Sequence, residues 1–183
     1  MMNVYIGLDI STSKIGVAIL SEKRKLLETK LIKLNKDLEL EERTREFIMQ
    51  LVPMLSERKT IGLFVEEPAS IFSMGKSSAH TISKLQRFNG MCSFAVRRVF
   101  SQNPTLISAN KARKLVGLKI KRGEDTKKKV IEWCQQKYPR DFIIVLTNYG
   151  NPKPGTDDMA DSIVIGLAGK ELLNENNNTT DKT

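Results

Sequence analysis

The chain has 183 residues, of which 30 are Lys or Arg and 21 are Asp or Glu, so its formal net charge is +9. With 40% hydrophobic and 28% charged residues, the composition is typical of a folded domain and excludes a disordered chain. No apolar run approaches the roughly 18 residues of a membrane span, which excludes an integral membrane protein. The positive charge favours an acidic partner such as nucleic acid.

The elements predicted first are three strands over residues 4–10, 15–20 and 26–34, which short turns join into an antiparallel meander. A helix over 38–55 follows, with a kink or early end at Pro53, and then a strand over 61–65 and a helix over 77–100. The remaining predicted elements are a strand over 105–108, helices over 110–116 and 126–138, a strand over 142–146 and a last helix over 157–173. Residues 174–183 are expected to form a disordered polar tail. We therefore predict one α/β domain over residues 1–173, with helices flanking a mixed sheet of a meander plus parallel strands.

The two cysteines, Cys92 and Cys134, lie in apolar helical patterns, where buried free thiols are expected rather than a disulfide. The first residues show no secretory signal. Together these features predict a cytoplasmic or other reducing compartment and not a secreted protein. Because there is no CxxC motif and His80 is the one histidine, a zinc site of Cys and His ligands is excluded.

Two predicted strands each carry an acid in or directly after an apolar run, where a charged side chain is unfavourable. Asp9 interrupts the apolar run 4–10, and Glu66 follows the apolar run 61–65. A carboxylate within a buried strand is costly unless it is paired or bound to a metal. Each acid alone could simply lie near water at a strand end, but two of them in one small domain favour a shared site.

A third acidic feature opens the last predicted helix. Asp158 and Asp161 are three residues apart, so they share one face of that helix, which continues as the apolar segment 162–168. Asp157 is explained by its favourable interaction with the helix dipole. With Asp9 and Glu66, the pair makes four carboxylates, which select hard cations such as Mg²⁺ or Mn²⁺. Two such ions can activate water against a phosphodiester, so the sequence predicts a metal-dependent nuclease.

The order of these acids resembles the ribonuclease H-like superfamily and, within it, the RuvC family of Holliday junction resolvases. The resemblance spans roughly residues 3–170. The segments that carry it are IGLDIS (6–11), VEE (65–67), IF (71–72), the stretch from KL (84–85) to Gly90, KLVG (114–117) with Lys127 and Lys128 beyond it, and DMADS (158–162).

The resemblance implies that residues 1–173 form a RuvC-like nuclease domain acting in DNA recombination and repair. It implies a crossover junction endodeoxyribonuclease that resolves four-way junctions by paired symmetric nicks, as a homodimer built on the helix over 77–100. Asp9, Glu66, Asp158 and Asp161 would be the catalytic residues and would hold two Mg²⁺ or Mn²⁺ ions in each active site. Such an enzyme belongs in a compartment that contains DNA.

Further residues are predicted to bind DNA. By the resemblance, Phe72 would be a wedge at the junction centre, although an aromatic residue at a strand end can equally be part of the core. The basic loop that follows Phe72 contains Lys76, which we also expect to bind DNA. By the resemblance, Lys114, Lys127 or Lys128 would face the DNA. Six cations within residues 119–129 are better explained by phosphate contacts than by a solvated face, which adds to the candidates Lys119, Lys121 and Arg122.

Two departures from the family pattern stand out. The glycine usual after the first Asp is replaced by the segment 11–13, and the stretch from Glu66 to Phe72 is long and contains Pro68. These departures are typical of a divergent branch, such as a phage or viral one.

Two alternatives stay open. Another ribonuclease H-like nuclease, acting on flaps, branched DNA or RNA–DNA hybrids, would have the same acids. An ATP-binding protein of the actin or sugar-kinase fold also begins with an acid followed by Ser and Thr, as in residues 9–13, but leaves the Asp158/Asp161 pair unexplained.

Overall fold

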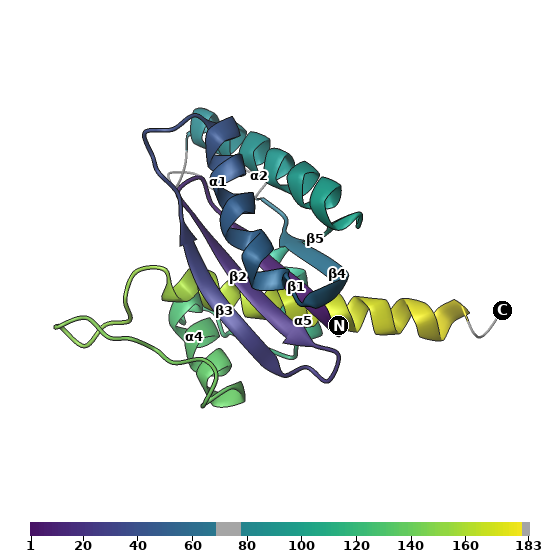
Figure 1. The fold of residues 1–183 in the computed structure, drawn as a ribbon. Coiled ribbons are helices and arrows are strands. Elements are labelled where there is room, and N and C mark those ends of the chain that lie inside the picture. The colour runs from purple at the N-terminus through teal and green to yellow at the C-terminus, as the bar shows by residue number, and fades with distance from the viewer. Residues whose placement is uncertain (69–77, 181–183) are drawn as a thin grey trace.

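The protein is described by a computed structural model covering residues 1–68 and 78–180. Its centre is a five-stranded sheet in the order β3-β2-β1-β4-β5 (Figure 1). The strands are β1 (Met2–Ile10), β2 (Lys14–Ser21), β3 (Leu26–Lys33), β4 (Arg58–Glu66) and β5 (Thr105–Ile107). Strands β1, β2 and β3 form an antiparallel meander, and β4 and β5 join β1 in parallel. The predicted mixed sheet is therefore confirmed.

Helices cover both faces of this sheet (Figure 1). Helix α1 (Leu40–Leu51), with the 3-10 turn η1 (Val52–Leu55), and helix α2 (Ala79–Phe100) pack on one face. Helices α3 (Ala109–Leu115), α4 (Thr126–Lys137) and α5 (Thr156–Thr180) pack on the other. A sheet covered on both faces needs strands that are apolar throughout, which is the pattern read from β1 and β4.

Side chains of alternating direction build the two halves of the core. Ile6 and Leu8 of β1 face α1 and α2, whereas Ala18 and Leu20 of β2 face α5. Cys92 and Cys134 are buried and free, as the sequence predicts. Within the described ranges, no helix is both long and apolar enough to cross a membrane.

Two sequence-based expectations are corrected. Residues 142–146 form no strand, since only an isolated bridge between Leu146 and Pro152 is made there. Helix α5 continues to Thr180, past its expected end at residue 173, because extending a formed helix costs far less than nucleating one. Phe72 and Lys76 lie outside the described residues.

Candidate metal centre

Asp9 and Glu66 are brought together by the parallel pairing of β1 and β4. In this ladder Leu8 pairs with Val65, so the residues that follow them lie side by side at the same edge of the sheet. Asn89, a buried residue of α2, donates a hydrogen bond of 3.1 Å from its Nδ2 to the Glu66 carbonyl oxygen. The position of Glu66 is thus fixed both by its strand and by the helix above it.

Asp161 reaches the same place because α5 lies unusually close to β1. A Cβ atom at Gly7 would lie 2.1 Å from the carbonyl oxygen of Ser162 and 2.6 Å from the backbone nitrogen of Gly166. Only glycine fits such an approach of helix to strand. The first turns of α5 are therefore pressed against the strand that carries Asp9.

Three carboxylates meet as a result. Asp9, Glu66 and Asp161 are each half-buried, and each offers an oxygen within 4.8 Å of the oxygens of the other two. They come from three elements that are far apart in the sequence. An all-oxygen group of this kind matches the preference of hard divalent cations.

The electrostatics of the three acids also favour a cation. Burial, followed by the charges of Glu66 and Asp161, raises the pKa of Asp9 well above its ordinary value. Burial and the charge of Asp161 raise the pKa of Glu66 to about 7. Burial raises the pKa of Asp161 to about 6. Carboxylates that resist ionisation together are stabilised by a cation placed among them, so these residues fit a metal site.

Asp158, the fourth predicted ligand, lies outside this group of three. Its carboxylate forms an ion pair with the Lys14 ammonium group of β2. Asp157 is held by Lys127, whose Nζ lies 2.6 Å from Asp157 Oδ2, and by Lys14 at 4.0 Å. Although burial opposes it, the two ammonium groups lower the pKa of Asp157 to about 2. The acids that open α5 are thus divided between the group of three and an ion-paired set.

Arg113 of α3 is a functional candidate that the sequence analysis missed. Its positive charge lowers the pKa of both Glu66 and Asp161, so its guanidinium lies within electrostatic reach of the carboxylates. Its Nε is buried and has no hydrogen-bond partner in the described part of the chain. In the sequence, Arg113 is one of three cations in a short segment with Lys111 and Lys114. Sequence alone does not distinguish an arginine beside the acids from one that faces solvent.

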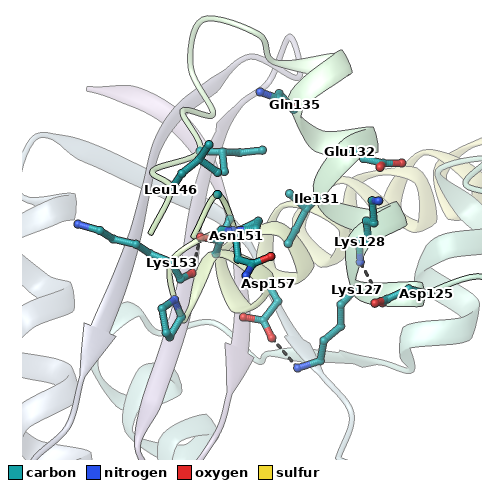
Figure 2. A pocket seen from close by; sticks show the side chains of 15 residues that line it. Asp125, Lys127, Lys128, Ile131, Glu132, Gln135, Leu146, Asn151, Lys153 and Asp157 are labelled. Atoms are coloured by element: carbon teal, nitrogen blue, oxygen red, sulfur yellow. Dashed lines mark hydrogen bonds and ion pairs between the residues drawn. The ribbon is translucent and has the colours of Figure 1, made fainter. Parts of the chain in front are cut away.

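The predicted DNA-binding residues that are described lie at three places. Lys114 and Lys119 line a cavity of about 380 Å³ together with Arg113. Lys127 and Lys128 line a groove of about 670 Å³ beside α5 (Figure 2). Lys121 and Arg122 are exposed in the loop between α3 and α4.

Comparison with known proteins adds one kind of evidence. No family model matches the sequence, and no curated protein matches it. Solved structures do match. A Thermus thermophilus RuvC in complex with a Holliday junction substrate is similar at a TM-score of 0.67 and 14% identity, with 94% of this chain and 95% of that one covered.

A second Thermus thermophilus RuvC structure matches at a TM-score of 0.62 and 14% identity, covering 96% of this chain and 97% of that one. The likeness extends over nearly the whole length of both proteins. The chain therefore has the ribonuclease H-like fold in its RuvC form.

Proposed function

We propose that the protein is a metal-dependent, structure-specific endonuclease that resolves four-way DNA junctions by paired symmetric nicks. The observation that carries this proposal is the meeting of Asp9, Glu66 and Asp161, with oxygens within 4.8 Å of one another, at one edge of the sheet. The RuvC-like fold around these residues supports the choice of branched DNA as substrate.

Asp9, Glu66 and Asp161 would hold divalent cations, Mg²⁺ or Mn²⁺, with Asp158 as the fourth ligand and two ions in each site. When bound, such ions supply an activated water and stabilise the leaving oxygen of a phosphodiester. Asp158 is ion-paired with Lys14 in this structure, so it would act as the fourth ligand only after leaving that partner. Lys14 would then lie beside the site, where its ammonium group could face a phosphate of the DNA.

The surroundings of the acids suit a polyanion. Arg113 contributes positive charge to Glu66 and Asp161, and Lys114 and Lys119 line the cavity next to it. Cations near a cut phosphate hold the strand in position and favour association with DNA. We assign these three residues to binding of the strand that is cut.

Pairing of two nicks requires two active sites. Helix α2 leaves Phe94 64% exposed and Val99 44% exposed, although its other face packs in the core. Apolar side chains exposed along one helix suit a contact with a second copy. We therefore propose a homodimer formed through α2, with one cut made by each copy.

The test is incubation of the purified protein with end-labelled DNA, with Mg²⁺ or with EDTA. The substrates are a four-way junction, a flap, an RNA–DNA hybrid and a linear duplex. Symmetric nicks on the junction, lost in EDTA and in Asp9→Asn, are expected. If the flap and the hybrid were cut as well as the junction, the proposed function would change from junction resolution to a broader nuclease activity that uses the same acids.

A matched pair of variants isolates the metal centre. Glu66→Gln removes one of the three carboxylates, whereas Glu67→Gln makes the same change at the neighbouring exposed residue. We expect Glu66→Gln to lose cutting by at least a hundredfold and Glu67→Gln to keep it. Full activity in Glu66→Gln would overturn the assignment of the site.

A further inference from the structure

A groove of about 670 Å³, which Asp157 at the start of α5 helps to line, lies between α4 and a hairpin that the sequence analysis did not foresee. We define the hairpin as residues 145–153. It projects from the body of the protein, in the yellow-green segment before α5 (Figure 1). Figure 2 shows Leu146 and Asn151 of the hairpin on one side of the groove and Ile131 and Lys128 of α4 on the other.

The hairpin has a defined backbone. The amide of Thr147 donates to the Asn151 carbonyl at 2.7 Å, and the amide of Lys153 donates to the Val145 carbonyl at 2.8 Å. Gly150 closes the turn with a φ of +76°, a conformation that suits glycine, and its amide donates to the Thr147 carbonyl at 3.0 Å. The hairpin wall of the groove is therefore built before any partner binds.

The charges of the groove favour an anion. Two of its three acids are ion-paired: Asp157 is bound by Lys127, and Glu132 lies 3.7 Å from the ammonium group of Lys129. Asp125 accepts from the backbone amide of Lys128 and keeps its negative charge. Among the described residues, Lys128 and Lys153 have no acidic partner within 4.0 Å. Two unpaired ammonium groups against one unpaired carboxylate leave the groove positively charged, with the Lys153 side chain extending outward from the hairpin (Figure 2).

The floor of the groove is apolar. Ile131 of α4, together with Ile144 and Leu146 before the hairpin turn, lines it, and Leu146 is 54% exposed. Apolar surface flanked by free ammonium groups is complementary to a nucleotide, whose base is flat and poorly hydrated and whose phosphate is charged. A partner without anionic groups would leave the ammonium groups of Lys128 and Lys153 unmatched.

The position of the groove connects it to the metal centre. Asp157 lines the inner end of the groove, and Asp158 and Asp161 follow on the same first turns of α5. A strand whose phosphate lies at the acids would reach the groove with its next nucleotides. We propose that the groove between α4 and the hairpin binds the cut DNA strand beside the nick, with phosphates on Lys128 and Lys153 and one base against Leu146. This inference rests on the proposed nuclease function.

Binding is measured first, in the Asp9→Asn background so that the DNA stays intact. The probe is a fluorescent four-way junction, and the readout is the change of its dissociation constant with salt. We expect Lys153→Glu to weaken binding at least tenfold and to reduce the salt dependence, because phosphate contacts are lost. The control is Lys59→Glu, an equal change at an exposed residue near the start of β4, the end opposite Glu66.

The base contact is tested separately in the active enzyme. After the nick is mapped, the nucleotide next to it is replaced by an abasic site. Apolar contact of that base with Leu146 predicts roughly tenfold slower cutting of the abasic junction by the wild type, because burial of apolar surface is lost. Leu146→Ala, a small change at an exposed position, is expected to cut the two junctions at nearly the same rate.

The outcomes separate the two proposals. If the wild type neither binds nor cuts junctions, the proposed function fails and this inference fails with it. If the wild type cuts, but Lys153→Glu binds like Lys59→Glu and Leu146→Ala keeps the full abasic effect, only the groove assignment is overturned. Melting curves of each variant show whether the fold is retained.

Discussion

Gly16 of β2 lies directly against the backbone of Asp158 in α5: a Cβ atom at position 16 would fall 2.0 Å from the Asp158 carbonyl oxygen. Gly16 is also the residue that pairs with Asp9 across the β1–β2 ladder. One glycine therefore sets the distance between the carboxylate of β1 and those of α5. The meeting of the carboxylates therefore depends on this contact as well as on the pairing of the strands.

Gly16→Ala should damage stability and activity together. The added methyl group meets backbone, which has no flexible end to move aside, so the start of α5 must shift. We expect a melting temperature lower by several degrees and at least tenfold slower Mg²⁺-dependent cutting, measured by thermal unfolding and by junction cleavage. The control for the melting temperature is Gly90→Ala in α2, where, apart from the helix's own backbone and the adjoining residues, nothing in the described part of the chain lies within 4 Å of the new Cβ. If Gly16→Ala melts like Gly90→Ala and cuts like the wild type, the contact does not position α5.

The raised pKa values of the acids make stability depend on pH in the absence of metal. The pKa of Glu66 is about 7 and that of Asp161 about 6, whereas an unfolded chain releases these protons near pH 4. Between these limits the folded state binds more protons, so its stability falls as pH rises from about 4 to about 7. Asp9, whose pKa is raised as well, contributes to the same loss of stability. In EDTA, we therefore expect the melting temperature to fall less between pH 5.5 and 7.5 in Asp9→Asn than in the wild type.

Mg²⁺ should remove this loss of stability. A ligand that binds only the folded state raises the melting temperature, and about 1 kcal/mol corresponds to about 2–4 °C for a domain of this size. We expect Mg²⁺ to stabilise the wild type at pH 7.5 but to have little effect on Asp9→Asn. An equal effect of Mg²⁺ on both proteins would show that the ion binds elsewhere.

Much of the site was predictable because it depends on strand ends. Asp9 and Glu66 each follow or interrupt a short apolar run, and parallel strands place such residues at one edge of a sheet. The spacing of Asp158 and Asp161 places both acids on one face of a helix. These are local patterns, and the three acids that meet were all among the predicted ligands.

The parts that were missed depend on contacts between distant residues. Lys14 binds Asp158 across 144 positions of sequence, and no pattern near either residue announces the pair. The apolar residues from 142 to 146 favour a strand locally, but within the described ranges they pair only through the bridge between Leu146 and Pro152. The effect of the Arg113 charge on the pKa of Glu66 and Asp161 depends on the packing of α3 against α5, which the sequence does not reveal.

Arg113 should influence the pH at which the enzyme works. Its positive charge lowers the pKa of Glu66 and Asp161, so its removal raises both values. Metal binding needs these groups ionised. We therefore expect Arg113→Ala to shift the acid limb of the pH–rate profile to higher pH and to slow cutting at pH 7 by at least tenfold.

Two further variants define this effect. Arg113→Lys keeps the charge and should restore the pH profile in part. Lys114→Ala removes an exposed cation of the same helix and should weaken DNA binding without moving the profile. If Arg113→Ala and Lys114→Ala behave alike, Arg113 acts only as a general DNA-binding cation.

The proposed homodimer predicts a measurable mass. Phe94 is 64% exposed on α2, in a helix whose opposite face is buried, and covering it requires a second copy or another partner. Light scattering of the 20.7 kDa chain at micromolar concentration should give about twice that mass.

Phe94→Glu places a charge in the contact and should give the monomer, with nicks on the two strands of a junction no longer paired. Val52→Glu adds the same charge to an exposed apolar residue outside α2 and should leave the dimer intact, since the proposed contact does not include that residue. A wild-type mass near that of one chain would remove the dimer from the mechanism and leave each cut to an independent molecule.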